Sequence, residues 1–477
     1  MKAPFSDYLK SIKKPLQQLE NNLREFYEYV SILATDSKGF SLRLSQHAKA
    51  VSSETMTTER GIVIRVMKDG LYSEYASNDM NLEDISSLTE EIKNQLDQQL
   101  QVLKETNTTI YETGKLEDEP CELFVEMECE ELPETTDLSK LVELFTTISN
   151  DTVQKDKDIV DCIVYGQSTH VCKMFLTKNR DLAQSYVYSE GGINVMKRKG
   201  NQNEFGSVNL AGRNGPEIFV GLKDMADEAI SITTDLLNGE RVIPGEYEVI
   251  TSPEVSGLIA HEAFGHGVEM DMFVKNRALG KDYIGKRVGS EHVTMHEGAL
   301  SAIDVASYAF DDEGVLASDV VEIDKGILKS GICDALSAKR LNFKATGNGK
   351  RENYAHKAYT RMTNTLFEGG NNTLDEMIAS IEYGYLLKGM RNGMEDPKHW
   401  GIQCVVDRGY EIKDGKLTGK IVCPLVLTGY VPDVLENVTM ATKEAYTFGT
   451  GGCGKGHKEW VKVSDGGPYL KTKVRLG

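Results

Sequence analysis

The chain has 477 residues, 40% of them hydrophobic and 27% charged, which is the composition of an ordinary folded protein with room for two or three domains. Its formal net charge is −19 and its densest basic runs are only "KRKG" and "NGKREN", so direct binding to nucleic acid is not expected. No apolar run approaches the roughly 18 to 20 residues that span a bilayer, and the N-terminus lacks a signal-like apolar core, so we expect a cytoplasmic protein without membrane segments.

The first half of the sequence alternates predicted helices and strands. Residues 1–50 have the apolar spacing of a helix, and residues 60–76 are typical of a β-hairpin that turns at "DG". Further helices are expected over 82–106, 137–155 and 219–238, and strands over 159–177 and 184–198. The acidic segment "EDEPCELFVEMECEELPETTD" is expected to be a solvated edge around one strand, although an interaction tail has a similar composition.

Glycine-rich turns and strand-like segments become more frequent beyond about residue 240. We therefore expect an α+β fold of two domains, an N-terminal domain of antiparallel strands and helices over 1–240 and a β-rich C-terminal domain over 241–477. The eight cysteines contain no CxxC pair, which argues against structural disulfides. Seven have apolar or alternating surroundings typical of buried thiols, whereas Cys453 lies in the glycine run "GTGGCGKG" and has no evident packing role.

The segment "HEAFGHGVEMD", from His261 to Asp271, is the most distinctive part of the second half. It follows a helix start at "SPE" and opens with the His-Glu pair of zinc proteases, but His266 comes at i+5 instead of i+4. Five residues on a regular helix turn a side chain by about 140°, so the two imidazoles would not meet at one metal ion. Because Gly265 and Gly267 flank His266, we expect His261 on regular helix and His266 on a distorted last turn or a π-bulge.

Two interpretations compete for this pattern, a metal site and a pair of core histidines. An isolated HExxxH favours the second, but Glu262 is costly to bury unpaired, and Cys453 offers a third donor for a metal. Two histidines and one cysteine with an open fourth position form a known catalytic zinc arrangement. His457 is a rival third donor. His292 and His296 form a competing pair in a strand-like segment, where surface histidines are the better interpretation.

Five segments together resemble the TldD/PmbA family: "HEAFGHGVEMD", "DDEGVLASD" (311–319), "ATGNGKRENYAH" (345–356), "RMTNT" (361–365) and "GTGGCGKG" (449–456). The likeness covers roughly 55–477 and is densest beyond 240. The family has metal-bearing TldD members and TldE (PmbA) members that lack HExxxH, and it is also described as modulators of DNA gyrase. Because this chain retains HExxxH, it resembles the TldD branch, although "GGCGKGHKEWVKVSDGGP" is longer and more charged than the family's tail.

The resemblance implies a zinc-dependent metallopeptidase of HExxxH type, with one Zn²⁺ per chain held by His261, His266 and Cys453 and with Glu262 as the general base. It also implies a dimer, of two copies or with a TldE/PmbA-like paralogue, that admits unfolded or extended peptides. The alternative is a non-catalytic TldE-like subunit or adaptor with a structural metal site, which the retention of Glu262 disfavours. Direct regulation of DNA gyrase rests on the family's description alone.

Two further groups of residues are expected near the site. Glu269 and Asp271 either orient a ligand imidazole through a hydrogen bond or are solvated loop acids. Four residues of the segment 347–365 are expected to line a substrate cleft or to stabilise an oxyanion: Arg351, Tyr354, His356 and Arg361. The alternative is that the arginines pair with acidic residues and that Tyr354 packs.

Overall fold

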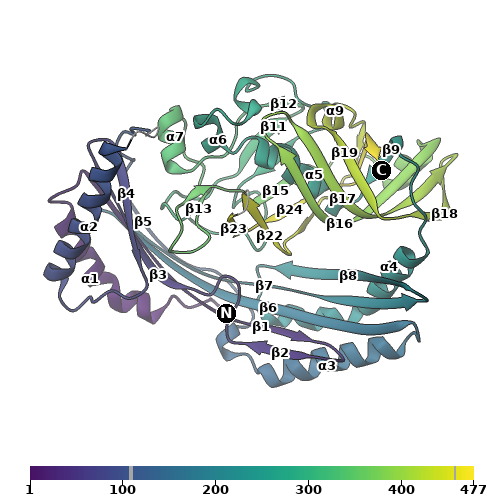
Figure 1. Cartoon of the computed structure of the whole chain (residues 1–477), viewed down its shortest axis with the longest axis horizontal. Coiled ribbons are helices and arrows are strands. Elements are labelled where there is room, and N and C mark those ends of the chain that lie inside the picture. Colours follow the sequence, from purple (N-terminus) through teal and green to yellow (C-terminus); the bar gives the residue numbers. More distant parts are fainter. Residues whose placement is uncertain (107–110, 456–457) are drawn as a thin grey trace.

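The computed structural model describes residues 1–106, 111–455 and 458–477. An eight-stranded sheet built by the first half of the chain lies beneath the helices and strands of the second half (Figure 1). Its central path runs β4-β3-β1-β6-β7-β5, with β2 beside β1 and β8 beside β7. The strands are β1 (Tyr29–Leu44), β2 (Lys49–Ser52), β3 (Arg60–Lys68), β4 (Leu71–Ser77), β5 (Cys121–Glu126), β6 (Ile159–Leu176), β7 (Arg180–Lys199) and β8 (Gln202–Gly212).

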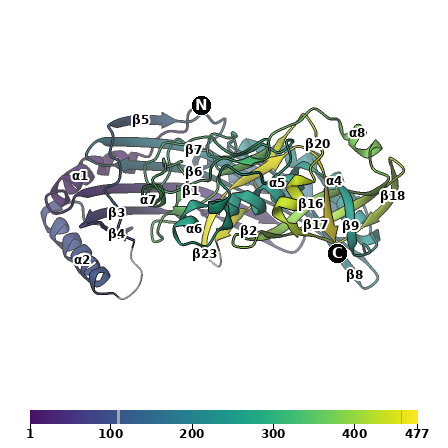
Figure 2. The same cartoon turned by 90° about the horizontal axis from the view of Figure 1, so that it is seen from above.

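Two pairs of amphipathic helices cover this sheet. Helices α1 (Asp7–Leu23) and α2 (Ile85–Glu105) bury apolar side chains against β1 and β3 at one end of the molecule (Figure 2). Helices α3 (Leu138–Gln154) and α4 (Ala226–Asn238) bury theirs against β6, β7 and β8. The four helices therefore seal two apolar clusters of the sheet.

The helices and strands expected in this half are mostly confirmed, with two corrections. The helical prediction over 1–50 is wrong beyond Leu23, because Tyr29–Leu44 forms the long strand β1. The first part of the helix predicted over 219–238 belongs to a 3₁₀ segment, Pro216–Asp224. The hairpin turn lies at Asp69 and Gly70, both with positive φ, as two-residue hairpin turns require.

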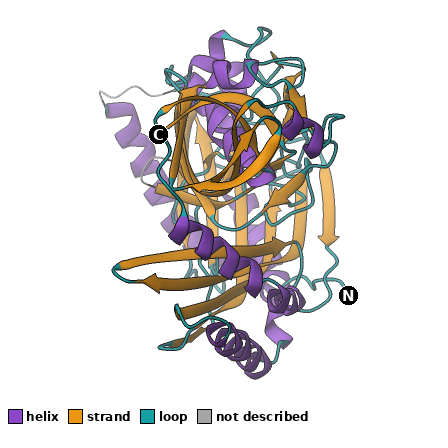
Figure 3. Cartoon of the chain, turned by 90° about the vertical axis from the view of Figure 1, so that its right-hand side faces the viewer, coloured by secondary structure: helices purple, strands orange, loops and turns teal. Residues whose placement is uncertain are grey.

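Five strands of the second half close into a ring, because β16 pairs with both β9 and β17 (Figure 3). The ring consists of β9 (Gly245–Thr251), β16 (Tyr383–Asp396), β17 (Gly401–Lys413), β19 (Leu425–Tyr430) and β25 (Leu470–Leu476), extended by β18 (Lys416–Val422) and β20 (Met440–Ala441). Helix α5 (Pro253–Ala260) packs Val255, Leu258 and Ile259 into the same apolar cluster as these strands.

A six-stranded sheet and two small hairpins complete this half. The sheet runs β12 (Ile327–Leu328), β11 (Val320–Asp324), β10 (Met295–Glu297), β15 (Asn364–Phe367), β24 (Ser464–Gly467) and β21 (Tyr446–Phe448). The hairpins are β13 (Gly349–Lys350) with β14 (Tyr359–Thr360), and β22 (Gly452–Lys455) with β23 (Lys458–Lys462). The short helices are α6 (Met270–Val274), α7 (Ala335–Leu341), α8 (Leu374–Ala379) and α9 (Val431–Glu436).

Buried ion pairs join the two halves. The guanidinium of Arg65 on β3 pairs with Glu74 at 2.7 Å and with Glu313 of the second half. Arg351, next to β13, donates to Glu74 at 3.0 Å. The expected mixture of helices and antiparallel strands is confirmed, and the division into two domains near 240, between α4 and β9, stays a prediction. None of the helices in the described ranges is both long and apolar enough to cross a membrane.

Candidate metal centre

The chain leaves α5 through a π-helical turn, His261–Gly265, which resolves the unusual spacing of the two histidines. The backbone N–H of His266 donates to the carbonyl of His261, an i→i+5 hydrogen bond. This wider turn brings side chains five residues apart onto one face. The two imidazole rings lie 5.1 Å apart and are perpendicular. The predicted helix distortion is present, but the expectation that His261 lies on regular helix is wrong, because the π-helical turn begins at His261 and ends before His266. Ser252 precedes the helix as expected, but its side chain makes no capping hydrogen bond.

Cys453 reaches the histidines from the distant hairpin of β22 and β23. Its sulfur lies 3.3 Å from Nε2 of His266, and one donor atom from each of His261, His266 and Cys453 lies within 4.8 Å of the others. The hairpin is held from behind by Arg361, which is fully buried and donates to the carbonyl of Cys453 at 2.8 Å and to that of Glu459. The position of Cys453 beside the two histidines therefore depends on a residue, Arg361, that is distant from the histidines in the sequence.

This donor set fits a zinc ion. Donors bonded to one zinc at about 2.0–2.1 Å for nitrogen and about 2.3 Å for sulfur lie about 3.5 Å apart at a tetrahedral angle. The observed separation of 3.3 Å between the sulfur of Cys453 and Nε2 of His266 is close to this value. Imidazole and thiolate are ligands that suit zinc, whereas calcium and magnesium prefer oxygen ligands.

The electrostatics of the cluster favour a thiolate. Burial opposes charge on the imidazoles, yet the neighbouring thiol of Cys453 raises the pKa of His261 to about 9 and that of His266 well above its usual range. Burial likewise opposes a thiolate, yet the two imidazoles hold the pKa of Cys453 well below its usual value. A divalent cation would stabilise the same thiolate in place of the protons.

Glu262 follows His261 on the π-helical turn and is 6% exposed. Burial raises the pKa of its carboxyl, while the two histidines act in the opposite direction. Its carboxylate has no hydrogen-bond partner among the described residues. Gly393 on β16 makes room for it, because a Cβ at Gly393 would lie 2.4 Å from Cγ of Glu262. The carboxylate is thus held beside the histidines and is free to exchange a proton.

Glu269 is a carboxylate within hydrogen-bonding distance of a histidine of the cluster. Its Oε2 lies 3.2 Å from Nδ1 of His266, and Lys455 lies 3.2 Å from the same oxygen. Attraction by Lys455 and His266 overcomes the effect of burial and lowers the pKa of Glu269 to about 2. Asp271 instead pairs with Lys455 at 2.6 Å and with Lys275 at 3.1 Å. Glu269 therefore contacts His266 directly, whereas Asp271 contacts Lys455, which lies next to Glu269.

The residues expected to line a cleft are dispersed. Arg351 is engaged by Glu74, and Nδ1 of His356 lies 3.0 Å from Glu352. The ring of Tyr354 covers Gly61, where a Cβ would lie 2.2 Å from it. Arg361 has no exposed surface and bonds the Cys453 hairpin. Their contact with a substrate stays a prediction.

The rival histidines lie elsewhere. His296 sits between Asp319 at 2.9 Å and Glu368 at 2.7 Å, and His292 is exposed, in keeping with surface histidines. His457 lies outside the described residues.

Two acidic residues near the centre were not foreseen. Asp465 on β24 lies 3.8 Å from Nδ1 of His261, and burial raises its pKa to about 7. Glu395 on β16 has both carboxylate oxygens buried without a hydrogen-bond partner in the described part of the chain, and burial raises its pKa to about 9. Neither residue belongs to a recognisable motif. They lie near the centre because β24 and β16 pack against α5.

Comparison with known proteins identifies relatives of this chain. The PmbA/TldA metallopeptidase C-terminal domain matches residues 244–474. A metalloprotease of Methanocaldococcus jannaschii is 34% identical over 278 residues, 58% of this chain and 60% of the relative. A zinc metalloprotease TldD homolog of Saccharolobus solfataricus is 32% identical over 240 residues, 50% of this chain and 52% of the relative. These matches thus span only about half to three fifths of the relatives.

The fold as a whole also has a solved counterpart. The crystal structure of TldE from Thermococcus kodakarensis superposes with a TM-score of 0.75 and 17% sequence identity, covering 97% of this chain and all of that one. At this identity the likeness concerns the fold alone. The overall fold of this chain therefore belongs to a known architecture.

Proposed function

Because the chain belongs to the TldD/PmbA family, we propose that it is a zinc-dependent peptidase that hydrolyses unfolded or extended peptides. The observation that carries the proposal is the convergence of His261, His266 and Cys453 beside an unpartnered Glu262. Structural zinc sites usually have four protein ligands, whereas the described residues supply three donors here. The fourth position is then left for water, as in catalytic zinc sites.

The chain's own residues divide the chemistry between them. His261, His266 and Cys453 would hold the zinc ion, which would lower the pKa of a bound water and polarise the scissile carbonyl. Glu262 accepts the proton of the attacking water and then donates it to the leaving amine. Glu269 accepts a hydrogen bond from Nδ1 of His266, which fixes the tautomer and leaves Nε2 for the metal. Arg361 keeps the Cys453 hairpin in place.

The family resemblance supports a proposal for the substrate class and the assembly. An extended peptide can pair its backbone with a sheet edge, which gives affinity with little sequence preference. The chain would work as a dimer, either with a second copy or with a TldE-like paralogue, and native mass spectrometry of the purified protein distinguishes the two. The solved TldE of related fold supports the second form. Under this proposal a folded protein substrate is not cleaved.

Hydrolysis of a fluorogenic unstructured peptide tests the proposal. We expect cleavage that stops with a chelator, returns with zinc and falls by about 10²–10⁴-fold in Glu262→Gln. Glu254→Gln is the matched control. Glu254 lies on the preceding helix α5, and its carboxylate accepts a hydrogen bond from the backbone N–H of Gly389 at 3.0 Å. If Glu262→Gln cleaves as fast as the unaltered protein, the peptidase proposal is wrong. A protein that binds zinc but cleaves nothing would be the TldE-like adaptor.

A further inference from the structure

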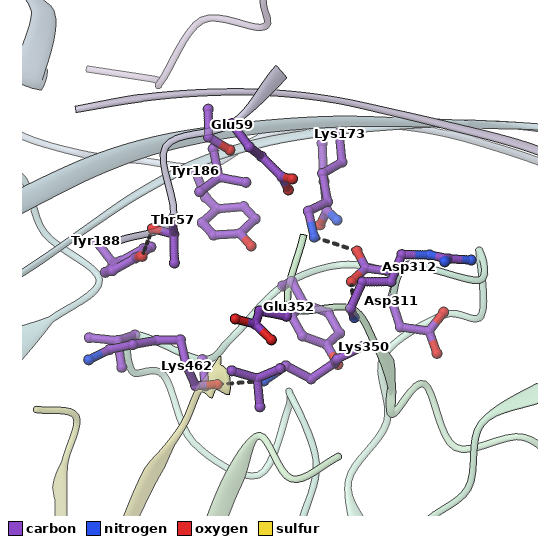
Figure 4. A pocket seen from close by; sticks show the side chains of 18 of the residues that line it. Thr57, Glu59, Lys173, Tyr186, Tyr188, Asp311, Asp312, Lys350, Glu352 and Lys462 are labelled. Carbon is purple, nitrogen blue, oxygen red and sulfur yellow. Dashed lines mark hydrogen bonds and ion pairs between the residues drawn. The ribbon is translucent and has the colours of Figure 1, made fainter. Parts of the chain in front are cut away.

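A polar cavity separate from the metal centre lies between the two halves of the chain, on the face of the long sheet that points towards the hairpin of β22 and β23 (Figure 4). The space that it offers to water-sized molecules is about 80 Å³, and the cavity is partly open to solvent. Its lining combines apolar and aromatic side chains, among them Val171, Val305, Phe310 and Trp460, with several charged groups. None of the metal-centre residues lines it.

The wall formed by the sheet carries a carboxylate without a cationic partner and a hydroxyl without a hydrogen-bond partner among the described residues. Glu59 accepts a hydrogen bond from the backbone of Tyr354 at 2.9 Å, and within the described residues no cationic nitrogen lies within 4.0 Å of its carboxylate. Tyr186 is 7% exposed, and its hydroxyl has no hydrogen-bond partner among those same residues. Both side chains reach into the cavity (Figure 4). A carboxylate and a hydroxyl held in this way match an ammonium group.

The opposite wall carries a buried cation. Lys350 on β13 is 9% exposed and donates to the carbonyls of Met362, at 3.0 Å, and Lys462. Within the described ranges no carboxylate oxygen lies within 4.0 Å of its amine. Burial lowers the pKa of Lys350 to about 7. A carboxylate placed there would stabilise the ammonium form, because a buried charge needs an opposite charge or several hydrogen bonds.

Lys173 adds a second cation near the same space. It reaches the cavity from β6 and pairs with Asp312, so part of its charge is already balanced. Its ammonium group carries three donors, of which Asp312 takes one. A ligand carboxylate between Lys350 and Lys173 would therefore find donors from both walls.

We propose that this cavity binds a short peptide with two free ends, such as a dipeptide. Its ammonium group bonds Glu59 and Tyr186, its carboxylate bonds Lys350, and an apolar side chain packs against Trp460. Glu59 stands on the sheet wall and Lys350 on the opposite wall, while Lys173 shares the sheet wall and Asp311, Asp312 and Glu352 also line the cavity. Short peptides are products of the proposed peptidase, and in that respect the ligand class rests on the proposed function, whereas the binding itself does not require the metal.

Trp460 provides a direct reporter of binding. The chain has two tryptophans, of which Trp460 is 46% exposed and lines the cavity, while Trp400 is fully buried in another cluster. Alanyl-phenylalanine is titrated into chelator-treated Glu262→Gln protein, which can neither hydrolyse the peptide nor bind it through zinc. We expect a saturable change in tryptophan fluorescence that disappears in Trp460→Phe, while calorimetry still detects binding in that variant.

The proposal is tested by removing the charged side chains of the cavity and by blocking the two termini of the peptide. We expect calorimetric affinity to fall about tenfold or more with Glu59→Gln, with Tyr186→Phe and with Lys350→Met, and by a similar factor when the peptide is N-acetylated or amidated. Glu291→Gln, an exposed carboxylate outside the lining of the cavity, is the control and leaves the affinity unchanged. Tyr186→Phe keeps the shape of the wall, so its result counts even if Lys350→Met fails to fold.

Three outcomes would overturn the proposal: no binding, equal binding of blocked and free peptides, or binding that survives all three cavity substitutions. Binding lost in His261→Ala but retained in Glu59→Gln would place the ligand at the metal centre and also overturn it. If the dipeptide does not bind this cavity, zinc-dependent cleavage by the unaltered protein can still occur. The two proposals can therefore fail independently.

Discussion

The sulfur of Cys453 lies 3.3 Å from Nε2 of His266, although 187 positions separate the two residues along the chain. The histidine comes from a widened helical turn and the cysteine from a two-stranded hairpin. Arg361 links the hairpin to the centre, since it bonds the carbonyl of Cys453 and lies 3.6 Å from Glu269. The metal centre is therefore a product of the tertiary fold of the second half.

Replacing Cys453 tests its place in the centre. We expect Cys453→Ser to lose most of its bound zinc and, after loading with cobalt, the near-ultraviolet sulfur-to-metal absorption, because a hydroxyl is a far weaker ligand than a thiolate. Metal analysis and absorption spectroscopy after dialysis measure both effects. Cys121→Ser, at a partly exposed cysteine on β5, is the control and keeps the metal. Equal zinc content in the two variants would remove Cys453 from the centre.

Glu269 and Asp271 are expected to differ in their effect on the metal. Glu269→Gln weakens the acceptor of Nδ1–H of His266, so we expect zinc affinity to fall by about 10–100-fold. Asp271→Asn disturbs only the pairs with Lys455 and Lys275 and serves as the matched control. Competition with a fluorescent zinc chelator measures both affinities. An equal loss in the two variants would mean that general charge, and not the hydrogen bond, sets the affinity.

Gly393 is predicted to control the position of Glu262. A methyl group at Gly393 would lie 2.4 Å from Cγ of Glu262, so Gly393→Ala must displace the carboxylate. We expect peptide hydrolysis to fall by about tenfold or more, with the zinc content unchanged. Gly401→Ala on the neighbouring strand β17 is the control, since nothing lies within 4 Å of its added carbon. Undiminished hydrolysis by Gly393→Ala would contradict the role of this carboxylate.

The ion pairs between the halves predict a pH-dependent stability. Burial alone would raise the pKa of Glu74, but Arg65 and Arg351 lower it from 4.5 to about 2. A lowered pKa stabilises the folded state above pH 4.5, by about 3 kcal/mol, and this contribution disappears as the pH falls towards 2. Arg351→Met leaves Glu74 with Arg65, so we expect a loss of about 2 kcal/mol at neutral pH and a smaller loss in acid.

Urea denaturation at several pH values measures this difference. Lys357→Met, at an exposed residue near the same segment, is the control and leaves stability nearly unchanged. A loss in Arg351→Met that is constant from pH 7 down to pH 3 would show that the effect does not arise from the charge of Glu74.

Local patterns predicted the elements whose apolar spacing was unbroken. Helices α2 and α3 and the hairpin of β3 and β4 lie within a few residues of their expected bounds. Strand β1 was missed because it is a central strand buried along most of its length, so the alternation that identifies a half-buried strand is absent. The 3₁₀ segment Pro216–Asp224 was missed because its apolar residues continue the spacing of α4.

The metal donors were accessible to sequence reasoning, and their surroundings were not. The i+5 spacing with flanking glycines indicated a distorted turn, although it was expected at His266 and begins at His261, and the glycine run indicated that Cys453 has a role other than packing. Asp465, Glu395 and Lys455 come near the centre only through the pairing of β24, β16 and β22 with other strands. Such pairings carry no local signature, so these residues required the structure.

X-ray absorption at the zinc edge of the zinc-loaded protein tests the proposed centre most directly. The arrangement of His261, His266 and Cys453 predicts one zinc per chain with one sulfur at about 2.3 Å, two imidazole nitrogens at about 2.0–2.1 Å and one further light ligand. The sulfur contribution should vanish in Cys453→Ser. A spectrum without sulfur in the unaltered protein, or one that is identical in the two proteins, would contradict the account.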